Sequence, residues 1–443
     1  MLLRILTSCL AALGLSLPAL AQSDAWTKEE LERVTRRIEK QVEQLRGHEF
    51  LRPVKVFLAD KKGFIDYALE RSGEMQDEAR TQALELVAKH LGLIPVDMDM
   101  METTLALLEE QVGGFYDPGK EAFYLMESFT GGVAEVILAH ELTHALDDQL
   151  HDLDGTLEQR TDSSDAIFAY SAVVEGSGTN AMQRWTLQNM DRLTMSDLTE
   201  ASSMGTDGLA DAPPYLWLPL LGTYMKGEAF LTRGRGIAKV EINAAIDRAF
   251  SSPPASSEQI LHPEKYWDPA KLDSPSTLRH DLSGVPEGWK VMTTDTMGEI
   301  GLAMFATPAA KRQGFDASSP FALMALQYTN RAASGWDGDQ LVLLGREDGA
   351  RVLHLATSWD RERDADEFRD ALEAQLEGLL AAQKQLGEGR GGWLVFDYAD
   401  PRQLSFALYS GCEEADVMAL REGPLSWSEE RAQDSIDKSS EED

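Results

Sequence analysis

The hydrophobic pattern divides the chain into a helical first part and a mixed second part. Apolar positions at helical spacing predict an amphipathic helix over 26–46 and helices over 76–112, with a break near 92–95. Helical patterning resumes over 214–250, after a loop-like stretch at 201–213. A short apolar run over 54–58 predicts one strand. The first part is therefore expected to be mainly helical, with a small sheet that has edge strands.

Beyond residue 266 the pattern changes. A segment rich in Pro, Asp and Ser suggests a linker over 267–287. The segments that follow predict four strands and one strong helix: strands over 340–344, 352–357, 393–398 and 404–409, and a helix over 363–385. We expect a smaller α+β domain over 288–423, with a helix across its sheet, and a polar, acidic, disordered tail over 424–443. The fold class of the chain is thus predicted as α+β.

The most specific chemical motif lies in a helix-forming run over 133–150. His140, Glu141 and His144 form the pattern H-E-x-x-H. Histidines four residues apart lie on one helix face, so both imidazoles are able to bind one metal ion. Glu141 would lie beside a water bound to that metal and accept its proton, as in zinc peptidases. The alternative is an ordinary amphipathic helix with two half-buried histidines.

A catalytic zinc site needs a third protein ligand. The extended pattern H-E-x-x-H-x-x-G-x-x-H fails here, because Asp147 and Leu150 occupy the Gly and His positions. Glu175 is a better candidate, since it follows an apolar run in a predicted helix and would be buried there. The weaker alternatives are Asp162, Asp165 and His151.

The residues after Glu175 support a close helix contact. Gly176 and Gly178 would each weaken a free helix by about 1 kcal/mol, which is reasonable if this helix presses against the one carrying the histidines. Thr179, one turn after Glu175, is expected to hydrogen-bond a ligand. Two acids one turn beyond His144 are expected either to orient a histidine or to be solvated: Asp147 and Asp148.

With H-E-x-x-H on one helix and a glutamate on the next, the chain resembles the gluzincin branch of zinc metallopeptidases. More narrowly, it resembles a family of largely uncharacterised exported bacterial proteins, over 113–125, 137–153, 173–179, 214–230 and 256–266. The resemblance implies a zincin-like domain over 22–266. It also implies the zinc ligands His140, His144 and Glu175, with Glu141 as general base. Where relatives tend to read E-G-E-A or E-G-D-A, this chain reads E-G-S-G, so position 177 carries no carboxylate.

Two further pieces of a peptidase site are expected. Residues 113–125 predict a hairpin around a turn at 117–120. It is either the edge strand that pairs with substrate in gluzincins or a plain structural hairpin. A peptidase also needs a donor that stabilises the oxyanion. Since His or Tyr fills this role in gluzincins, the candidates are Tyr224, His262 and Tyr266; for His262 a structural role is an equal alternative.

The N-terminus predicts export. Arg4, an apolar run over 5–17 and the small residues before Gln22 are typical of a signal peptide over 1–21, cleaved after Ala21. The alternative is lipidation at Cys9. No later apolar run is long enough to span a membrane, so a periplasmic or secreted protein is expected. After cleavage only Cys412 remains, which excludes an internal disulfide.

The net charge of the chain excludes some classes of binding partner. Asp and Glu number 75 against 41 Lys and Arg, which gives a formal net charge of −34. So acidic a chain repels nucleic acid and anionic membranes. A short acidic stretch at 336–339 superficially suggests calcium, but it lacks the rest of a calcium loop, so a tight turn is expected.

The expected function is therefore an exported zinc metallopeptidase, a hydrolase that acts on a peptide or protein substrate with one Zn²⁺. Two nitrogen ligands and one carboxylate suit Zn²⁺, although Co²⁺ or Mn²⁺ would also fit such a site. One alternative is a catalytically silent zinc-binding protein with a zincin fold, against which the intact Glu141 argues. Another is a zinc amidase that acts on cell-wall peptides, because the ligand set does not separate amide substrates.

Overall fold

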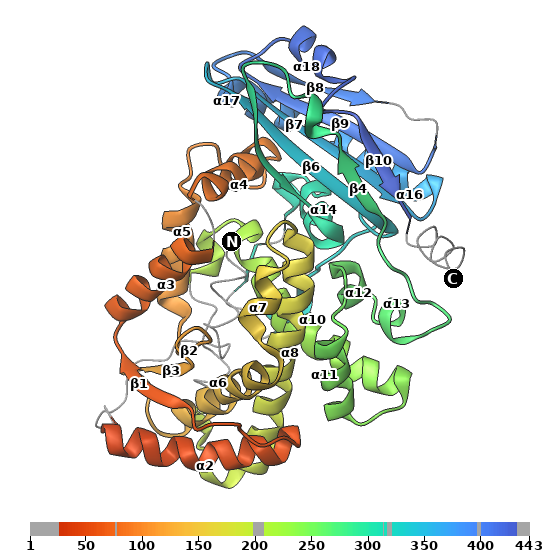
Figure 1. Ribbon diagram of the computed structural model, residues 1–443. Helices are drawn as coiled ribbons and strands as arrows, with labels where there is room; N and C mark the ends of the chain where they lie inside the picture. Colours follow the sequence, from red (N-terminus) through yellow and green to blue (C-terminus); the bar gives the residue numbers. More distant parts are fainter. Residues whose placement is uncertain are drawn as a thin grey trace.

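A helical part and an antiparallel sheet stand at opposite ends of the molecule (Figure 1). This computed structural model describes residues 26–75, 78–197, 208–312, 314–316, 321–396 and 400–431. The predicted signal peptide, Cys9 and most of the predicted loop at 201–213 lie outside the described residues. The chain is α+β, as predicted from its sequence. In the described part, no helix combines the length and apolar composition that a membrane span requires.

The helical part contains a small three-stranded sheet of order β1-β3-β2. Strand β3 pairs in parallel with β1 and antiparallel with β2. The strands are β1 (Lys55–Ala59), β2 (Gly114–Asp117) and β3 (Ala122–Met126). The helices are α2 (Lys28–Arg46), α3 (Lys61–Met75), α4 (Glu78–His90), α5 (Met100–Gln111), α6 (Gly131–His151), α7 (Leu153–Glu158), α8 (Ser164–Gln188), α10 (Pro214–Ala238), α11 (Ile242–Ser251), α12 (Ser257–Leu261) and α13 (Glu264–Trp267).

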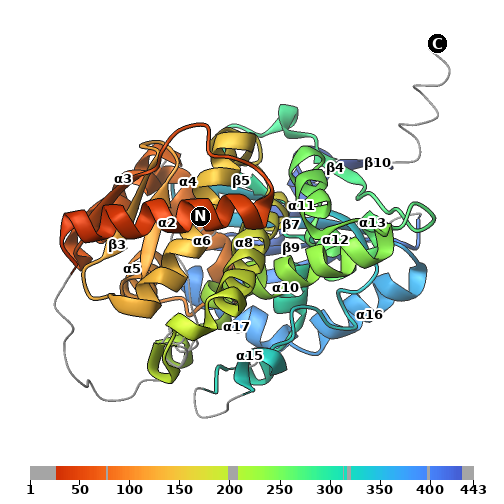
Figure 2. The same ribbon diagram turned by 90° about the horizontal axis from the view of Figure 1, so that it is seen from below.

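Helix α2 shows how local sequence sets these boundaries. Thr27 and Glu30 form a capping box at its start, and Gly47 ends it with a positive φ of 77°. Its buried apolar residues recur at helical spacing, from Leu31 to Leu45. The predicted helix over 26–46 is confirmed, as are the helix break near 92–95, the strand near 54–58 and the hairpin around 117–120. Figure 2 shows α2 lying across the helices of this part.

The C-terminal part is built on a five-stranded antiparallel sheet of order β5-β6-β7-β9-β8. The strands are β5 (Trp289–Asp295), β6 (Trp336–Arg346), β7 (Arg351–Trp359), β8 (Gly391–Phe396) and β9 (Gln403–Ser410). A separate pair joins β4 (Thr277–His280) to β10 (Trp427–Glu430). The helices of this part are α14 (Gly298–Ala306), α15 (Ala322–Ala325), α16 (Glu362–Glu373), α17 (Leu376–Leu386) and α18 (Glu414–Leu420).

Several boundaries in the C-terminal part differ from the sequence prediction. The single helix expected over 363–385 is two helices, α16 and α17, with a break at Ala374 and Gln375. The tight turn expected at 336–339 is the start of β6, with a β-bulge between Trp336 and Gly338. A Cβ on Gly338 would lie 2.5 Å from the backbone oxygen of Ser276, so the bulge lets the two backbones approach closely.

The predicted linker and tail also form structure. Part of the linker is β4, and residues 427–430 of the tail are β10, so the prediction of disorder was wrong for that stretch. The two strands pair over four residues, from Trp427 with His280 to Glu430 with Thr277. Glu429 also accepts hydrogen bonds from Ser358 (2.8 Å) and Gln403 (2.5 Å). Ladder bonds that join distant segments hold these polar strands in place.

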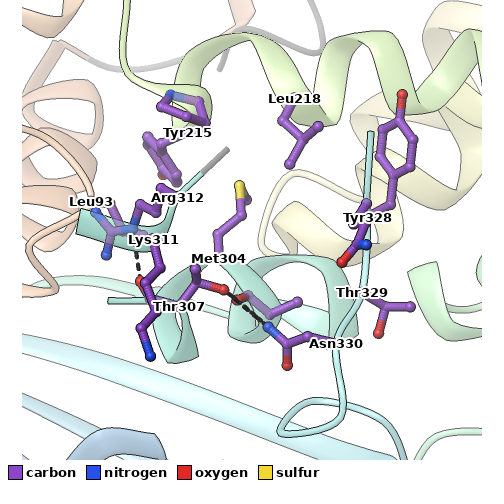
Figure 3. A pocket seen from close by; sticks show the side chains of 13 residues that line it. Leu93, Tyr215, Leu218, Met304, Thr307, Lys311, Arg312, Tyr328, Thr329 and Asn330 are labelled. Carbon is purple, nitrogen blue, oxygen red and sulfur yellow. Dashed lines mark hydrogen bonds between the residues drawn. The ribbon is translucent and has the colours of Figure 1, made fainter. Parts of the chain in front are cut away.

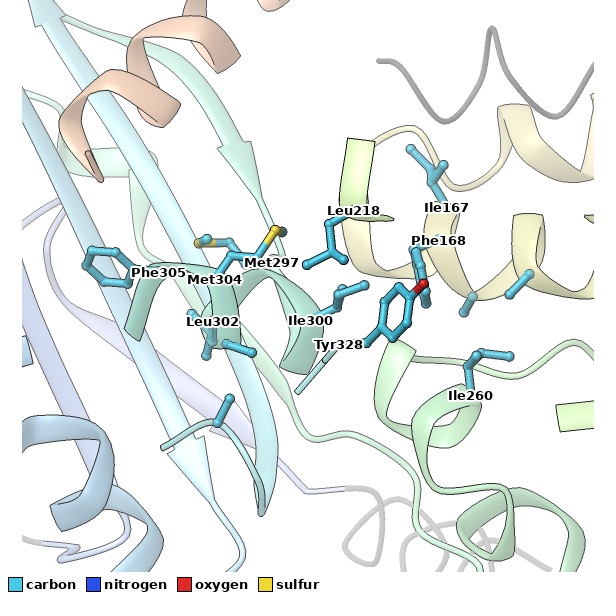
Figure 4. Close-up of a cluster of buried hydrophobic side chains, with 14 of the residues drawn as sticks. Ile167, Phe168, Leu218, Ile260, Met297, Ile300, Leu302, Met304, Phe305 and Tyr328 are labelled. Atoms are coloured by element: carbon cyan, nitrogen blue, oxygen red, sulfur yellow. The ribbon is translucent and has the colours of Figure 1, made fainter. Parts of the chain in front are cut away.

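One hydrophobic core continues from the helical part into the C-terminal part. In Figure 4, Ile167 and Phe168 of α8 and Leu218 of α10 lie on one side, opposite Ile300 of α14 and Met297, which directly precedes that helix. A half-buried lysine forms a cluster of ion pairs at the same junction. Lys265 of α13 forms ion pairs with Glu258 (2.5 Å), Asp273 (2.6 Å) and Asp360 (3.1 Å). Because apolar burial is the main stabilising term, the two parts are expected to unfold together.

The first turn of α8 is held by the C-terminal part. Asp295, the last residue of β5, accepts hydrogen bonds from the backbone N–H (2.7 Å) and hydroxyl (2.6 Å) of Ser164. Asp165 in turn accepts from the backbone N–H of Ser257, the first residue of α12, at 2.8 Å. Burial raises the pKa of Asp165 to about 7, although the bonds from Ser257 oppose the rise. Acceptors at helix starts satisfy N–H groups that have no partner inside the helix.

A fully buried arginine links α2 to the central helices. Arg46 donates to Asp147 of α6 from Nε (3.0 Å) and Nη2 (2.8 Å). Its Nη2 also reaches Asp247 of α11, at 3.1 Å. Both Arg46 and Asp147 are inaccessible to solvent, so neither charge is compensated by water.

Replacement of the buried arginine should therefore be costly. We expect Arg46→Ala to lower the free energy of unfolding by about 3–5 kcal/mol, because Asp147 is left buried and unpaired. Urea unfolding of the purified protein measures this. Lys62→Ala is the control, since the exposed pair of Lys62 with Asp66 should contribute less than about 1 kcal/mol. Equal losses in the two variants would contradict the assignment.

Two buried histidines connect β4 to the five-stranded sheet. His280 Nε2 lies 2.7 Å from His354 Nδ1, and His354 Nε2 lies 3.2 Å from the hydroxyl of Ser405. At the other end, His280 Nδ1 lies 3.0 Å from the side-chain oxygen of Gln340. That oxygen only accepts, so the chain is complete when both rings are neutral. Burial lowers the pKa of His280 to about 4 and that of His354 well below its usual value.

This histidine pair should make the protein sensitive to acid. In the unfolded chain histidines take up protons near pH 6.5, whereas in the folded protein His280 does so near pH 4. The unfolded state therefore binds more protons between these values, and stability falls as the pH drops through this window, by about 3 kcal/mol for His280. Unfolding by urea at pH 7.5 and at pH 4.5 measures the loss. The double variant His280→Gln, His354→Gln should reduce this loss, and the part that remains includes the contribution of His90, whose pKa burial also lowers to about 4. His48→Gln, at a partly exposed histidine, should leave the loss unchanged.

Candidate metal centre

Helix α6 presents both histidines of the H-E-x-x-H motif to the interior. Every residue from Val133 to Asp147 is buried, so the helix has no solvated face there. Helix α6 lies in the middle of the helical part, between α2 and α8, and contacts both. The rings of His140 and His144 meet edge to face, with centroids 4.5 Å apart. The four-residue spacing thus brings the two imidazoles together as the sequence predicts.

Helix α8 adds the carboxylate of Glu175 to this pair. Glu175 Oε2 lies 3.2 Å from His140 Nε2 and 3.3 Å from His144 Nε2, while the two Nε2 atoms are 2.8 Å apart. Ligands bound tetrahedrally to zinc at about 2.1 Å lie about 3.4 Å from one another. The three donor atoms therefore converge on one point at close to the spacing of a zinc site, and they form one of two such groups in the described residues.

The second such group is not a comparable site. Glu258, Asp273 and Asp360 surround the ammonium group of Lys265, which offsets part of their negative charge. Burial raises the pKa of Glu258 to about 9, although Lys265 opposes the rise. A cation thus stands where a metal ion would have to bind, and the group is a structural clamp.

The electrostatics of the histidine group indicate one shared proton. Burial lowers the pKa of His144, but the Glu175 carboxylate outweighs it, so the pKa rises to about 9. Burial and the neighbouring His144 lower the pKa of His140. Burial would raise the pKa of Glu175, but the two histidines reverse this and lower it. A neutral His140 therefore stands beside an ion pair of His144 with Glu175, and a metal ion would have to displace the His144 proton.

Several buried polar atoms in this group lack partners. Glu175 Oε1 and both carboxylate oxygens of Glu141 form no hydrogen bond within the described residues. Burial raises the pKa of Glu141 well above its ordinary value, and the charge of Glu175 adds to the rise. Buried polar groups are rarely left unsatisfied in native proteins. These unpaired oxygens beside three convergent donors fit a site that holds a metal ion and a water.

Close packing of α8 makes this convergence possible. A Cβ on Gly178 would lie 2.8 Å from the Cε1 atoms of both His140 and His144, which is closer than real contacts allow. Gly176 behaves differently from the prediction, because it faces α10 rather than α6. A Cβ there would lie 2.5 Å from the backbone of Gly227. Gly178 is thus required by the histidines, and Gly176 by the crossing of α8 with α10.

The alternatives for the third position lie elsewhere. Asp165 accepts from the backbone of Ser257, Asp162 is exposed, and the ring of His151 stacks on Phe250 with centroids 4.6 Å apart. None of them belongs to the group formed by the two motif histidines. The geometry therefore favours Glu175 over all three.

Of the three oxyanion candidates, the structure brings only Tyr224 to the motif. Its ring lies 5.9 Å from that of His140, nearly parallel to it. His262 and Tyr266 lie with α12 and α13, across α8 from α6 (Figures 1 and 2). His262 Nε2 is 3.0 Å from Glu299 Oε1, and the Tyr266 hydroxyl donates to the Ser252 carbonyl at 2.6 Å. Both are engaged in structural contacts, which corrects the expectation that either faces the metal ligands.

The acids after His144 bind neighbours other than the histidines. Asp147 accepts from Arg46 and, at 2.6 Å, from the hydroxyl of Ser177. Asp148 accepts from the hydroxyl of Tyr116 (2.9 Å), and burial raises its pKa to about 6. A carboxylate at position 177 would face Asp147, so the serine suits this chain. Thr179 Oγ1 is buried and makes no hydrogen bond to Glu175 within the described residues.

Two features of the site were missed from the sequence. Arg46 supplies the buried positive charge under α6, yet it lies 101 residues before Asp147, and no local pattern marks it. The burial of the hairpin was also missed. All four residues of β2 are buried, although β2 pairs on one side only, so the solvent-exposed edge of a recognition strand is lacking. Burial thus favours the structural interpretation of the hairpin.

Gly178 offers a sharp test of the centre. Alanine normally stabilises a helix by about 1 kcal/mol relative to glycine. We expect Gly178→Ala instead to lower the Zn²⁺ affinity at least about tenfold, because its Cβ overlaps both imidazoles. The matched control is Gly236→Ala on α10, where a Cβ meets nothing within 4 Å. Competition with a zinc-chelating dye measures both, and an unchanged affinity in Gly178→Ala would contradict the arrangement.

Comparison with known proteins adds one finding. Residues 289–420 match the family model of a domain of unknown function, DUF8575. This stretch runs from β5 to α18 and covers the C-terminal sheet, not the histidine group. No curated protein and no solved structure matches the chain.

Proposed function

We propose that this chain is an exported zinc-dependent metallopeptidase of the gluzincin type. The observation that carries the proposal is the convergence of His140 Nε2, His144 Nε2 and Glu175 Oε2 within 3.3 Å, in the fully buried interior. Two imidazoles and one carboxylate are the ligand set of catalytic zinc in this class. A zinc ion held there would supply Lewis acidity towards a peptide carbonyl and a water.

Glu141 is the proposed general base. Glu141 lies on α6 between the two histidines, directly after His140. No neighbouring side chain forms a hydrogen bond with either of its carboxylate oxygens. Its raised pKa suits a group that takes up a proton during attack and returns it to the leaving amine. A protein that only stores zinc has no use for an unpaired buried carboxylate at this position.

Tyr224 is the proposed donor to the oxyanion. It comes from α10, on which Gly227 lets the backbone approach α8. Its ring lies against that of His140, so the phenol is held next to the ligands. Hydrogen-bond donors that are fixed before the reaction stabilise developing negative charge most effectively.

The burial of the proposed zinc ligands and general base limits the kind of substrate that fits. His140, Glu141, His144 and Glu175 are each at most 1% exposed. A folded protein surface cannot reach groups this deep, so the proposed activity requires a substrate without folded structure. We therefore expect cleavage of unstructured peptides rather than of folded proteins.

The test compares the purified mature protein with Glu141→Gln and Glu175→Ala. We expect the parent to bind one zinc and to cleave a mixed peptide library. Glu141→Gln should keep the zinc and lose about 10²–10⁴-fold in cleavage rate. Glu175→Ala should lose at least about 100-fold in zinc affinity, because even residues behind the ligands contribute 10–100-fold. Metal analysis and mass spectrometry of the peptides measure these effects.

The controls separate the possible failures. Glu241→Ala removes an exposed glutamate and should change neither zinc content nor cleavage. A parent that binds zinc tightly but cleaves no peptide would refute the peptidase while leaving the metal centre. A parent that binds no zinc, or a Glu175→Ala variant with unchanged zinc affinity, would refute the centre itself.

A further inference from the structure

Two adjoining cavities lie where α10 and α14 meet, at the junction of the two parts of the chain. Figure 3 shows the first, of about 100 Å³, around Met304 of α14. The second has a volume of about 110 Å³ and extends towards Phe168 of α8. Both are walled by the same three side chains: Leu93, Tyr215 and Met304. Domain junctions are a common place for ligand pockets, and these two together form an elongated apolar space.

The walls are suited to an aliphatic chain. An engineered apolar cavity of about 150 Å³ stays dry and binds benzene, and the two cavities together exceed that volume. Met304 stands between them, and an unbranched methionine side chain adapts readily to a ligand. A partly open space lined by Leu, Met, Ile and Tyr side chains is stabilised more by a hydrocarbon than by water.

The rim of the first cavity carries two cations, Lys311 and Arg312, that have no acidic partner among the residues the structure describes. Arg312 donates from Nε to the Thr307 carbonyl at 3.0 Å and from Nη1 to the Gly92 carbonyl. A guanidinium has five N–H donors, so three remain unused within the described residues. Lys311, which lines the same cavity, forms no ion pair within the described residues either. This is unusual in a chain with 75 acidic residues against 41 basic ones.

Because Arg312 is partly buried, the lack of a carboxylate partner in the described residues is energetically costly. Burial lowers the pKa of this guanidinium, and no carboxylate in the described part of the chain offsets the cost of desolvation. Half-buried charges are normally paired or hydrogen-bonded to a counter-ion. In Figure 3 the Arg312 side chain lies beside Leu93 and Tyr215, at the edge of the apolar walls.

We propose that this junction binds a small anionic amphiphile, with its aliphatic tail in the cavities beside Met304 and its carboxylate or phosphate on Arg312 and Lys311. A guanidinium binds both kinds of head group through paired N–H donors. The site is separate from the histidine group, since none of its lining residues is a motif residue. Its existence does not depend on the proposed peptidase activity.

The experiment uses the whole mature chain and four probes with eight-carbon chains: octanoate, octyl phosphate, octan-1-ol and octylammonium. Isothermal titration calorimetry should show saturable binding of octanoate, weaker binding of octanol and weakest binding of octylammonium. Octyl phosphate should bind at least as well as octanoate if a phosphate head group is preferred. No saturable binding of octanoate or octyl phosphate, or binding of octylammonium equal to that of octanoate, would overturn the proposal.

Variants at the rim identify the head-group site. Arg312→Gln should weaken octanoate binding about tenfold or more and leave octanol binding within about twofold. Arg331→Gln is the matched control, because that exposed arginine is paired with Glu367 and lines neither cavity. If Arg312→Gln fails to fold, Lys311→Gln tests the same head group, and Arg312→Lys should retain binding. Octanoate affinity unchanged in both neutral variants would overturn the proposal.

A membrane source of the amphiphile makes a different prediction. Binding to anionic phosphatidylglycerol vesicles that competes with octanoate would support the same site and identify a lipid as its source. Vesicle binding that octanoate does not affect and that Arg312→Gln does not weaken would overturn the assignment to this junction.

Discussion

Helix α8 crosses its two neighbours at positions where a side chain of any size would collide with backbone or with imidazole. A Cβ on Gly227 of α10 would lie 1.9 Å from the carbonyl oxygen of Ala172, and one on Gly176 would strike the backbone of Gly227. Two turns of helix are therefore in backbone contact, with Gly178 against the histidines of α6 on the other side. These contacts fix how closely α8 packs against α6, and Glu175 is therefore brought within 3.3 Å of both imidazoles. The positions of the three side chains in the candidate centre are therefore set mainly by helix packing, and less by the attraction among the side chains themselves.

The buried carboxylates of the chain are compensated differently from those at its surface. The chain carries a formal charge of −34, yet its interior holds carboxylates that each have a defined acceptor role. Asp147 is balanced by Arg46, Asp295 caps α8, and Asp165 caps α12. Excess negative charge is thus kept at the surface, where water solvates it, and buried charge is tied to cations or helix starts. Glu141 stands apart from these acids, because no side chain in the described residues forms a hydrogen bond or ion pair with it.

The sequence predicted what depends on local spacing. The predicted helix over 133–150 is α6, and its four-residue spacing brings the two histidines together. Helix α14 escaped prediction because its residues are almost all apolar and show neither helical nor strand periodicity. Strand β10 was taken for disorder because it is polar, and its partner β4 lies about 150 residues earlier in the chain. His262 and Tyr266 have side chains suited to the role of oxyanion donor, but only the tertiary fold shows that α8 separates them from the motif.

The C-terminal part has a physical connection to the candidate centre through the start of α8. The backbone N–H of Asp165 donates to the Thr296 carbonyl at 3.0 Å, and Asp295 binds Ser164 just before it. Both acceptors belong to the segment that matches DUF8575. The helix that carries Glu175 therefore begins on the C-terminal sheet and runs from there past the histidines of α6. A helix held at its first turn and packed along its length has little freedom to rotate or slide, so Glu175 keeps its position relative to His140 and His144. This argues that the C-terminal part is a structural component of the centre rather than an appended module.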